Sequence, residues 1–180
     1  MARVSKRAGK SAKPSTALRL DHYLPYRLGV AASDVFKVIA PYYRRLGLNM
    51  PELAVLSVLA EEAELTQQTI VERTVMEKFA VSRAARALID RGLVRTSSHA
   101  TDGRSYYLAL TRSGRELYDR VAPMSLAYEA KLAEIMGAAA MDDIKQALHH
   151  LQEAAKLVAK SRQKLLSPYV DAGKTTTRPK

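Results

Sequence analysis

The sequence contains no cysteine. The chain therefore cannot form disulfides, bind a metal through thiolates or sense oxidants through a thiol. Its four histidines are scattered, and the adjacent pair His149 and His150 would point in directions about 100° apart on a helix. The sequence therefore predicts no metal site, and nothing in it indicates a cofactor.

Long apolar runs and catalytic motifs are also absent. The basic N-terminal segment is not followed by an apolar stretch that could form a signal-peptide core or span a bilayer, so we expect a cytoplasmic protein without a membrane partner. The sequence has no phosphate-binding loop, nucleophile elbow, metal-ligand cluster or Rossmann fingerprint. We therefore predict no catalytic residue and no enzymatic activity.

The formal net charge of +11 is concentrated at the two ends of the chain. Residues 1–20 contain six basic and no acidic residues, residues 156–180 contain seven basic and one acidic, and residues 21–155 contain 16 basic and 17 acidic. We interpret residues 1–17 as a disordered basic arm and residues 167–180 as a flexible basic tail. Basic tails attract DNA, RNA and acidic membranes about equally, so the net charge alone does not identify a partner.

A long first helix is predicted by apolar residues that recur at helical spacing from Leu24 to Leu46. Pro41 removes a backbone hydrogen bond within this segment, so we expect a kink or a break there. Gly47 is expected to end the helix.

Three shorter helices are predicted in the middle of the chain. Asn49 begins a capping-box pattern for a helix that runs to about Glu62, and Thr66 can cap a short helix through about Arg73. A compact turn then leads into a third helix at residues 77–91. One side of this third helix is an apolar stripe formed by Val81, Ala84, Ala85 and Leu88.

A β-hairpin is predicted next, because the pattern changes from helical to extended after Gly92. Its strands are residues 93–98 and 105–111, joined by a polar turn. Two further helices are expected, one from Thr111 to about Met136 and one that includes Ile144, Leu148, Leu151, Ala155 and Val158. The fold class is therefore mainly α with a small β-hairpin wing.

The predicted order of elements is suited to binding double-stranded DNA: two short helices joined by a tight turn are followed directly by a hairpin. The second helix fits the major groove, and the hairpin reaches an adjacent backbone or minor groove. Arginine binds guanine O6 and N7 in bidentate fashion, so Arg83 and Arg86 are the first candidates for base contacts. The full set of candidate DNA-binding residues on this helix is Lys78, Ser82, Arg83 and Arg86.

The same residues resemble the MarR family of bacterial transcriptional regulators. The family's wing pattern is matched by Asp102-Gly-Arg104-Ser-Tyr-Tyr-Leu108-Ala-Leu110-Thr111, and Gly114 agrees as well. Val81-Ser82-Arg83 followed by Leu88, Arg91, Gly92 and Leu93 resembles the family's recognition helix and the residues that end it. One departure is the turn within residues 70–76, which lacks the usual glycine.

The resemblance implies a homodimeric winged helix-turn-helix repressor. It divides the chain into an N-terminal dimerisation helix at 18–48, a DNA-binding lobe at 49–111 and C-terminal dimerisation helices at 112–166. A twofold dimer prefers a pseudo-palindromic operator with half-sites about one DNA turn apart, and bound protein would be associated with the nucleoid. The resemblance also implies that Arg104 reaches the minor groove while Asp102 helps to orient the wing.

The family's effector cleft suggests a small aromatic acid or an aromatic acyl thioester as ligand. Tyr23, Tyr26 and Arg27 would supply a stacking wall and an anion partner, with Arg44 as a further candidate. Tyrosines at such positions are more often core or interface aromatics than ligand contacts. The alternative is a constitutive or architectural DNA-binding protein without an effector.

Overall fold

The structure is a computed structural model that describes residues 17–98 and 106–161. The chain forms two compact units, residues 1–122 and 123–180. Residues 1–16 of the predicted arm, the predicted tail at 167–180 and the hairpin tip at 99–105 lie outside the described residues.

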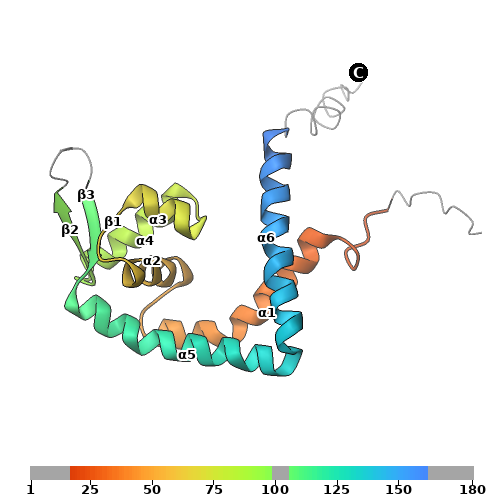
Figure 1. Ribbon diagram of the computed structural model, residues 1–180, viewed down its shortest axis with the longest axis horizontal. Helices are drawn as coiled ribbons and strands as arrows, with labels where there is room; N and C mark the ends of the chain where they lie inside the picture. The colour runs from red at the N-terminus through yellow and green to blue at the C-terminus, as the bar shows by residue number, and fades with distance from the viewer. Residues whose placement is uncertain (1–16, 99–105, 162–180) are drawn as a thin grey trace, which may run out of the picture. The chain divides into compact units, whose positions relative to one another are not determined.

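The described chain is mainly helical and carries a small antiparallel sheet, which confirms the predicted fold class (Figure 1). The first unit contains α1 (Leu24–Arg45), α2 (Met50–Glu61), β1 (Leu65–Thr66), α3 (Gln67–Thr74), α4 (Lys78–Asp90), β2 (Val94–Ser98), β3 (Tyr106–Leu110) and the start of α5 (Arg112–Met136). The second unit contains the rest of α5 and α6 (Ala138–Lys160).

Side-chain caps determine where the short helices begin. The Asn49 side chain accepts a hydrogen bond from the Glu52 backbone at 3.0 Å, and the Glu52 carboxylate accepts one from the Asn49 backbone at 3.1 Å. This is the predicted capping box of α2. Thr66 caps α3 by accepting from the Thr69 backbone at 3.1 Å, also as predicted.

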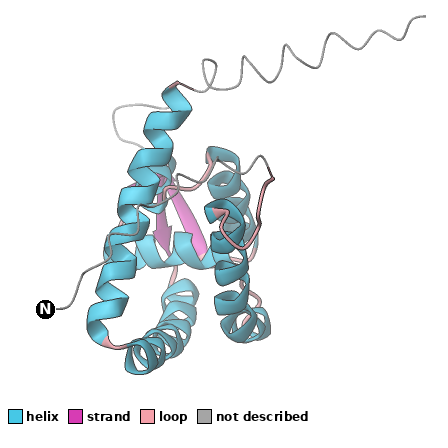
Figure 2. Ribbon diagram, turned by 90° about the vertical axis from the view of Figure 1, so that its right-hand side faces the viewer, coloured by secondary structure: helices cyan, strands magenta, loops and turns pink. Residues whose placement is uncertain are grey.

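The sheet has three strands in the order β1-β3-β2, one more than the sequence analysis predicted. All neighbours are antiparallel: Leu65 pairs with Leu108 between β1 and β3, and Thr96 pairs with Leu108 between β2 and β3. Figure 2 shows the sheet strands in magenta among the helices. Because β1 pairs with Tyr107 and Leu108 of β3, the predicted hairpin is joined to the segment that leads into α3.

The core of the first unit lies between α2, α4 and the sheet. In α4 the predicted apolar stripe is buried, with Val81 and Leu88 fully inaccessible to solvent. It packs against α2, in which Val55 and Leu56 are also fully buried. The opposite side of α4 is therefore left facing solvent.

The sequence predicted a kink or a break at Pro41, and the structure excludes the break, because α1 continues through this residue to Arg45. The next residues anchor the last turn: Tyr43 is buried, and the Tyr42 hydroxyl donates to the Arg120 backbone carbonyl of α5 at 2.9 Å. These tertiary contacts offset the one backbone hydrogen bond that proline cannot make.

The second unit is a pair of helices joined at Gly137, whose φ of 89° is in the left-handed region. An ion pair joins Lys145 of α6 to Glu129 of α5. No residue of α6 is buried within the described chain. No helix in the described ranges 17–98 and 106–161 is both long and apolar enough to cross a membrane.

Candidate nucleic-acid interface

The turn between α3 and α4 contains a residue in an unusual conformation. Val75 adopts φ 54° and ψ 21°, the left-handed region that β-branched residues rarely occupy. The turn is held by Thr74, whose hydroxyl donates to the Ile70 carbonyl at 2.7 Å. Valine therefore occupies the conformation that a glycine would adopt without strain.

All four candidate residues of α4 lie on its exposed side, away from the buried stripe. They do not face a single direction. Ser82 and Arg86 line a groove toward the hairpin, whereas Arg83 lines a smaller hollow beside Asn49 at the start of α2. Helical geometry places Arg83 and Arg86 nearly opposite the stripe, with Lys78 and Ser82 toward one side.

Ion pairs distinguish the basic residues of this unit from one another. Arg86 pairs with Asp90 at 2.9 Å, and Arg95 pairs with Glu64 at 3.0 Å. Arg73 is bound to Glu61 and Glu62, and Arg91 lies 3.4 Å from Glu52 and donates to the Gly47 carbonyl. Among described partners, the side chains of Lys78 and Arg83 have no ion pair or hydrogen bond, so their charges remain available to a polyanion.

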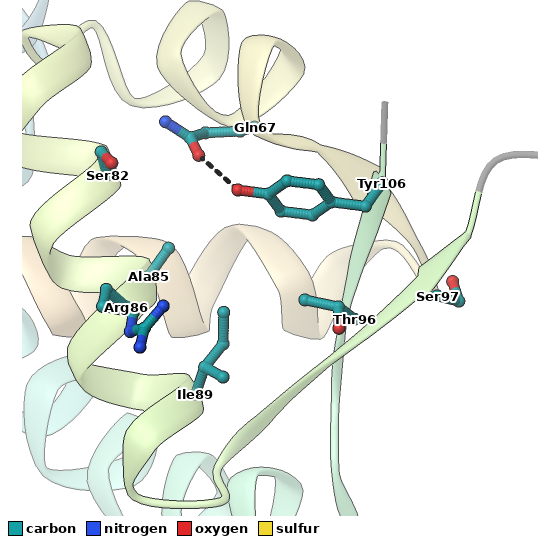
Figure 3. Close-up of a pocket in the computed structure, with 8 residues that line it drawn as sticks. All are labelled: Gln67, Ser82, Ala85, Arg86, Ile89, Thr96, Ser97 and Tyr106. Carbon is teal, nitrogen blue, oxygen red and sulfur yellow. Dashed lines mark hydrogen bonds between the residues drawn. The ribbon is translucent and has the colours of Figure 1, made fainter. Parts of the chain in front are cut away.

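The groove between α4 and the hairpin has a volume of about 730 Å³. Figure 3 shows that its wall combines side chains of α4 with side chains of the strands and with Gln67 at the start of α3. The Tyr106 hydroxyl donates to the Gln67 side-chain oxygen at 3.4 Å and links β3 to α3. Hydroxyl, amide and guanidinium groups therefore meet in one open groove. The sequence analysis had named only two of its lining residues, Ser82 and Arg86, as DNA-binding candidates.

The wing residues Asp102 and Arg104 lie outside the described residues, so their predicted roles stay predictions. In the described part of the chain, no cluster of three or more histidine, aspartate or glutamate side chains is suited to bind a metal ion.

The effector candidates are placed in two separate regions of α1. Tyr23 and Tyr26 lie exposed at its start, where the Arg27 guanidinium donates to the Asp21 carbonyl at 3.1 Å. Arg44 is 17 residues further along the helix than Arg27, roughly 25 Å at the rise of an α-helix. Within one chain, a small ligand that contacts Tyr23 therefore cannot reach Arg44.

The charge near Arg27 is partly compensated. The Arg19 guanidinium, which bonds the Asp21 carboxylate at 2.7 Å, holds the pKa of that carboxyl below its ordinary value, with a smaller contribution from the charge of Arg27. Asp21 is therefore ionised near neutral pH, and its charge competes with an anionic ligand for Arg27.

The sequence analysis did not name Phe79, an exposed residue on the same face of α4 as Arg83. It is the second residue of α4, and 81% of it is exposed. The available signal was its spacing, since Phe79 precedes Arg83 by one helical turn and so shares its face.

Comparisons with known proteins agree with this geometry. A family model described as the MarR family matches residues 46–105. An HTH-type transcriptional repressor of Mycobacterium tuberculosis is 28% identical over 130 residues, which cover 72% of this chain and 91% of the repressor.

Two solved structures are similar in fold. The transcriptional repressor CouR, bound to a 23-mer DNA duplex, has a TM-score of 0.68 at 24% identity over 76% of this chain and 99% of its own. NadR in complex with 4-hydroxyphenylacetate has a TM-score of 0.61 at 20% identity over 84% of this chain and 97% of its own. With α4 exposed beside a hairpin, the lobe at residues 46–105 is the part of this chain that matches the MarR family, and the proteins similar to the chain over most of its length are transcriptional regulators.

Proposed function

We propose that the chain is a homodimeric repressor that binds a pseudo-palindromic operator through α4 and is released from it by a small aromatic acid or acyl thioester. The observation that carries the DNA-binding part is the division of α4 into two sides. One side is a fully packed apolar stripe, and the other presents Lys78 and Arg83 without a compensating acid among the described residues. An exposed cationic face on the second helix of a helix-turn-helix is suited to the major groove.

The groove beside α4 suits the DNA backbone that separates the major groove from the minor groove. Gln67, Ser82, Thr96 and Tyr106 supply neutral donors at its wall, and Arg86 supplies a charge that Asp90 partly neutralises. Such groups position a protein on phosphates without reading sequence. We therefore assign base reading to Arg83 and backbone positioning to Ser82 and Arg86, with Arg104 of the wing in the minor groove and Asp102 orienting it.

Dimerisation is supported by apolar side chains that the single chain leaves exposed. On α1 they include Leu24, Leu28 and Val35, and on α6 they include Ile144, Leu148 and Leu157. Exposed apolar residues at helical spacing along terminal helices indicate a protein interface. A twofold partner would also set the distance between two copies of α4 at about 34–36 Å, one turn of DNA.

The effector part rests on the aromatic start of α1. Tyr23 and Tyr26 offer exposed rings beside the cationic Arg27, an arrangement suited to an aromatic carboxylate. NadR, a structural neighbour, is complexed with 4-hydroxyphenylacetate. In this proposal Arg44 contributes only through a different chain of the dimer. A ligand releases DNA only if it binds more tightly to a dimer whose recognition helices are wrongly spaced.

The competing function is a constitutive or architectural DNA-binding protein. Its support is the basic composition of residues 1–20 and 156–180, which attract DNA without regard to sequence. Selection of genomic fragments by the purified protein at physiological salt separates the two functions, because nonspecific attraction is then screened. Recovery of a palindromic motif supports the repressor, whereas recovery without a motif supports the alternative.

The role of Arg83 is tested on a fragment recovered in this way. We expect Arg83→Ala to weaken binding to the recovered fragment by about 1–3 kcal/mol, roughly 5- to 150-fold, with a much smaller effect on random DNA. The matched control is Lys37→Ala, which removes one charge from an α1 side chain paired with Asp34 at 2.8 Å. Equal losses on both DNAs for Arg83→Ala would show that Arg83 contacts only phosphate.

A further inference from the structure

Phe79 is the most exposed of the large apolar side chains in the described ranges 17–98 and 106–161, at 81%. A phenylalanine ring left in water forgoes the hydrophobic stabilisation that burial against a partner would give. The lobe itself cannot cover the ring. Phe79 lies nearly opposite the stripe of Val81 and Leu88, which faces the core.

The position of Phe79 on α4 points to DNA as that partner. It lies in the first turn, next to Lys78 and one helical turn before Arg83. The N-terminal residues of a recognition helix come closest to the base edges. The ring therefore lies on the same face of α4 as Arg83, a cation that has no compensating acid among the described residues.

The chemistry of the major groove limits what such a ring can contact. Base edges there present hydrogen-bond donors and acceptors, which a phenyl ring cannot bond, and one apolar group, the C5-methyl of thymine. A ring placed against that methyl removes both apolar groups from water. A cytosine at the same position would put a polar amino group against the ring and leave it without a hydrogen bond.

We propose that Phe79 is a specificity-determining residue that contacts a thymine methyl group in each half-site, beside the base read by Arg83. This inference rests on the proposed function, because it requires α4 to enter the major groove. It adds to that function a preference for thymine at one defined position of each half-site.

The test uses the full-length protein and a fragment recovered by genomic selection. Each symmetric pair of thymines is replaced by deoxyuridine, which removes only the C5-methyl groups. We expect one of these thymine pairs to matter. Losing its methyl group in one half-site should weaken binding by the wild-type protein on the order of 4-fold, and losing it in both half-sites about 15-fold, because each loss removes one buried methyl-sized group. Phe79→Ala should bind the thymine duplex more weakly but lose nothing further on the deoxyuridine duplex.

Two further variants make the test specific. Phe79→Leu retains an apolar contact and should keep a reduced thymine preference. Arg83→Ala removes a neighbouring contact and should leave the deoxyuridine penalty at its wild-type size. Because Phe79 is 81% exposed, its replacement should leave the folded structure intact, which circular dichroism checks.

The outcomes distinguish this inference from the proposed function. A recovered motif in which no thymine pair is coupled to Phe79 overturns the thymine contact alone and leaves the repressor function standing. Unchanged DNA binding by Phe79→Ala does the same and indicates that the ring serves a protein partner. Selection that recovers no motif overturns both proposals.

Discussion

A methyl group added at Gly114 is expected to destabilise the DNA-binding lobe. Gly114 is buried in the first turn of α5, where this helix passes the segment that leaves α4. A Cβ atom at this position would lie 2.0 Å from the Leu93 carbonyl oxygen and 3.4 Å from Cδ2 of Leu110. The nearer atom belongs to the backbone, so no side-chain rotation relieves the overlap.

The size of the effect follows from the contacts around this overlap. The shortest ordinary carbon–oxygen contact is about 3.3 Å, so α5 and Leu93 must separate by more than about 1 Å. The same segments are joined by two hydrogen bonds from Thr111, to the Leu93 carbonyl at 3.0 Å and to the Gly92 carbonyl at 2.7 Å. Weakening them costs about 1 kcal/mol each, overpacking costs about 1–3 kcal/mol, and the better helix propensity of alanine returns about 1 kcal/mol. We expect Gly114→Ala to lower the free energy of unfolding by about 2–4 kcal/mol.

Urea unfolding followed by circular dichroism measures this loss. The protein concentration is held constant, because the stability of a dimer depends on it. At a slope of about 2 kcal/mol per molar urea, the midpoint should fall by about 1–2 M. Gly29→Ala is the matched control, since a Cβ at Gly29 meets no atom within 4 Å and alanine should raise the midpoint slightly. A Gly114→Ala midpoint equal to that of the wild type would refute the argument.

Two smaller changes in stability are also expected, each read from the urea midpoint. Val75→Gly should raise the free energy of unfolding by about 0.5–1 kcal/mol, because the left-handed strain of about 1–2 kcal/mol exceeds the added backbone entropy of glycine. Val75 is exposed, so little burial is lost, and a lower midpoint would mean that its side chain is covered in the proposed dimer. Asn49→Ala should lower the free energy of unfolding by about 1 kcal/mol through loss of the α2 cap, and an unchanged midpoint would show that Glu52 and Arg91 suffice to hold that helix start.

The predicted helices agree with the structure because their signals are local. The start of α2 at Asn49 and the end of α4 before Gly92 follow from hydrogen bonds and backbone angles within a few residues. The apolar stripe of α4 was also readable from its period. The strand β1 was missed because two residues, Leu65 and Thr66, are too short to show any period.

The outcome at Pro41 depended on long-range contacts. The sequence shows a proline within a helical pattern, for which a kink or a break is the ordinary expectation. The buried Tyr43 and the bond from Tyr42 to Arg120, 78 residues away, hold the turn in place. Nothing in the sequence near Pro41 indicates that contact.

The sequence by itself determined the order of the elements, the helix-turn-helix and hairpin arrangement, and the face of α4 that packs inward, because caps and periods act over a few residues. Only the tertiary structure decided which charges and rings remain free. Arg83 lies within α4 and Arg91 is its C-terminal cap, yet only Arg91 binds Gly47 and Glu52, which are 44 and 39 residues away in the sequence. The sequence places Phe79 outside the apolar stripe of α4, but only the packing of the lobe shows that 81% of this residue stays exposed. Burial and ion pairing depend on residues that folding brings together from distant parts of the chain, so local patterns cannot report them.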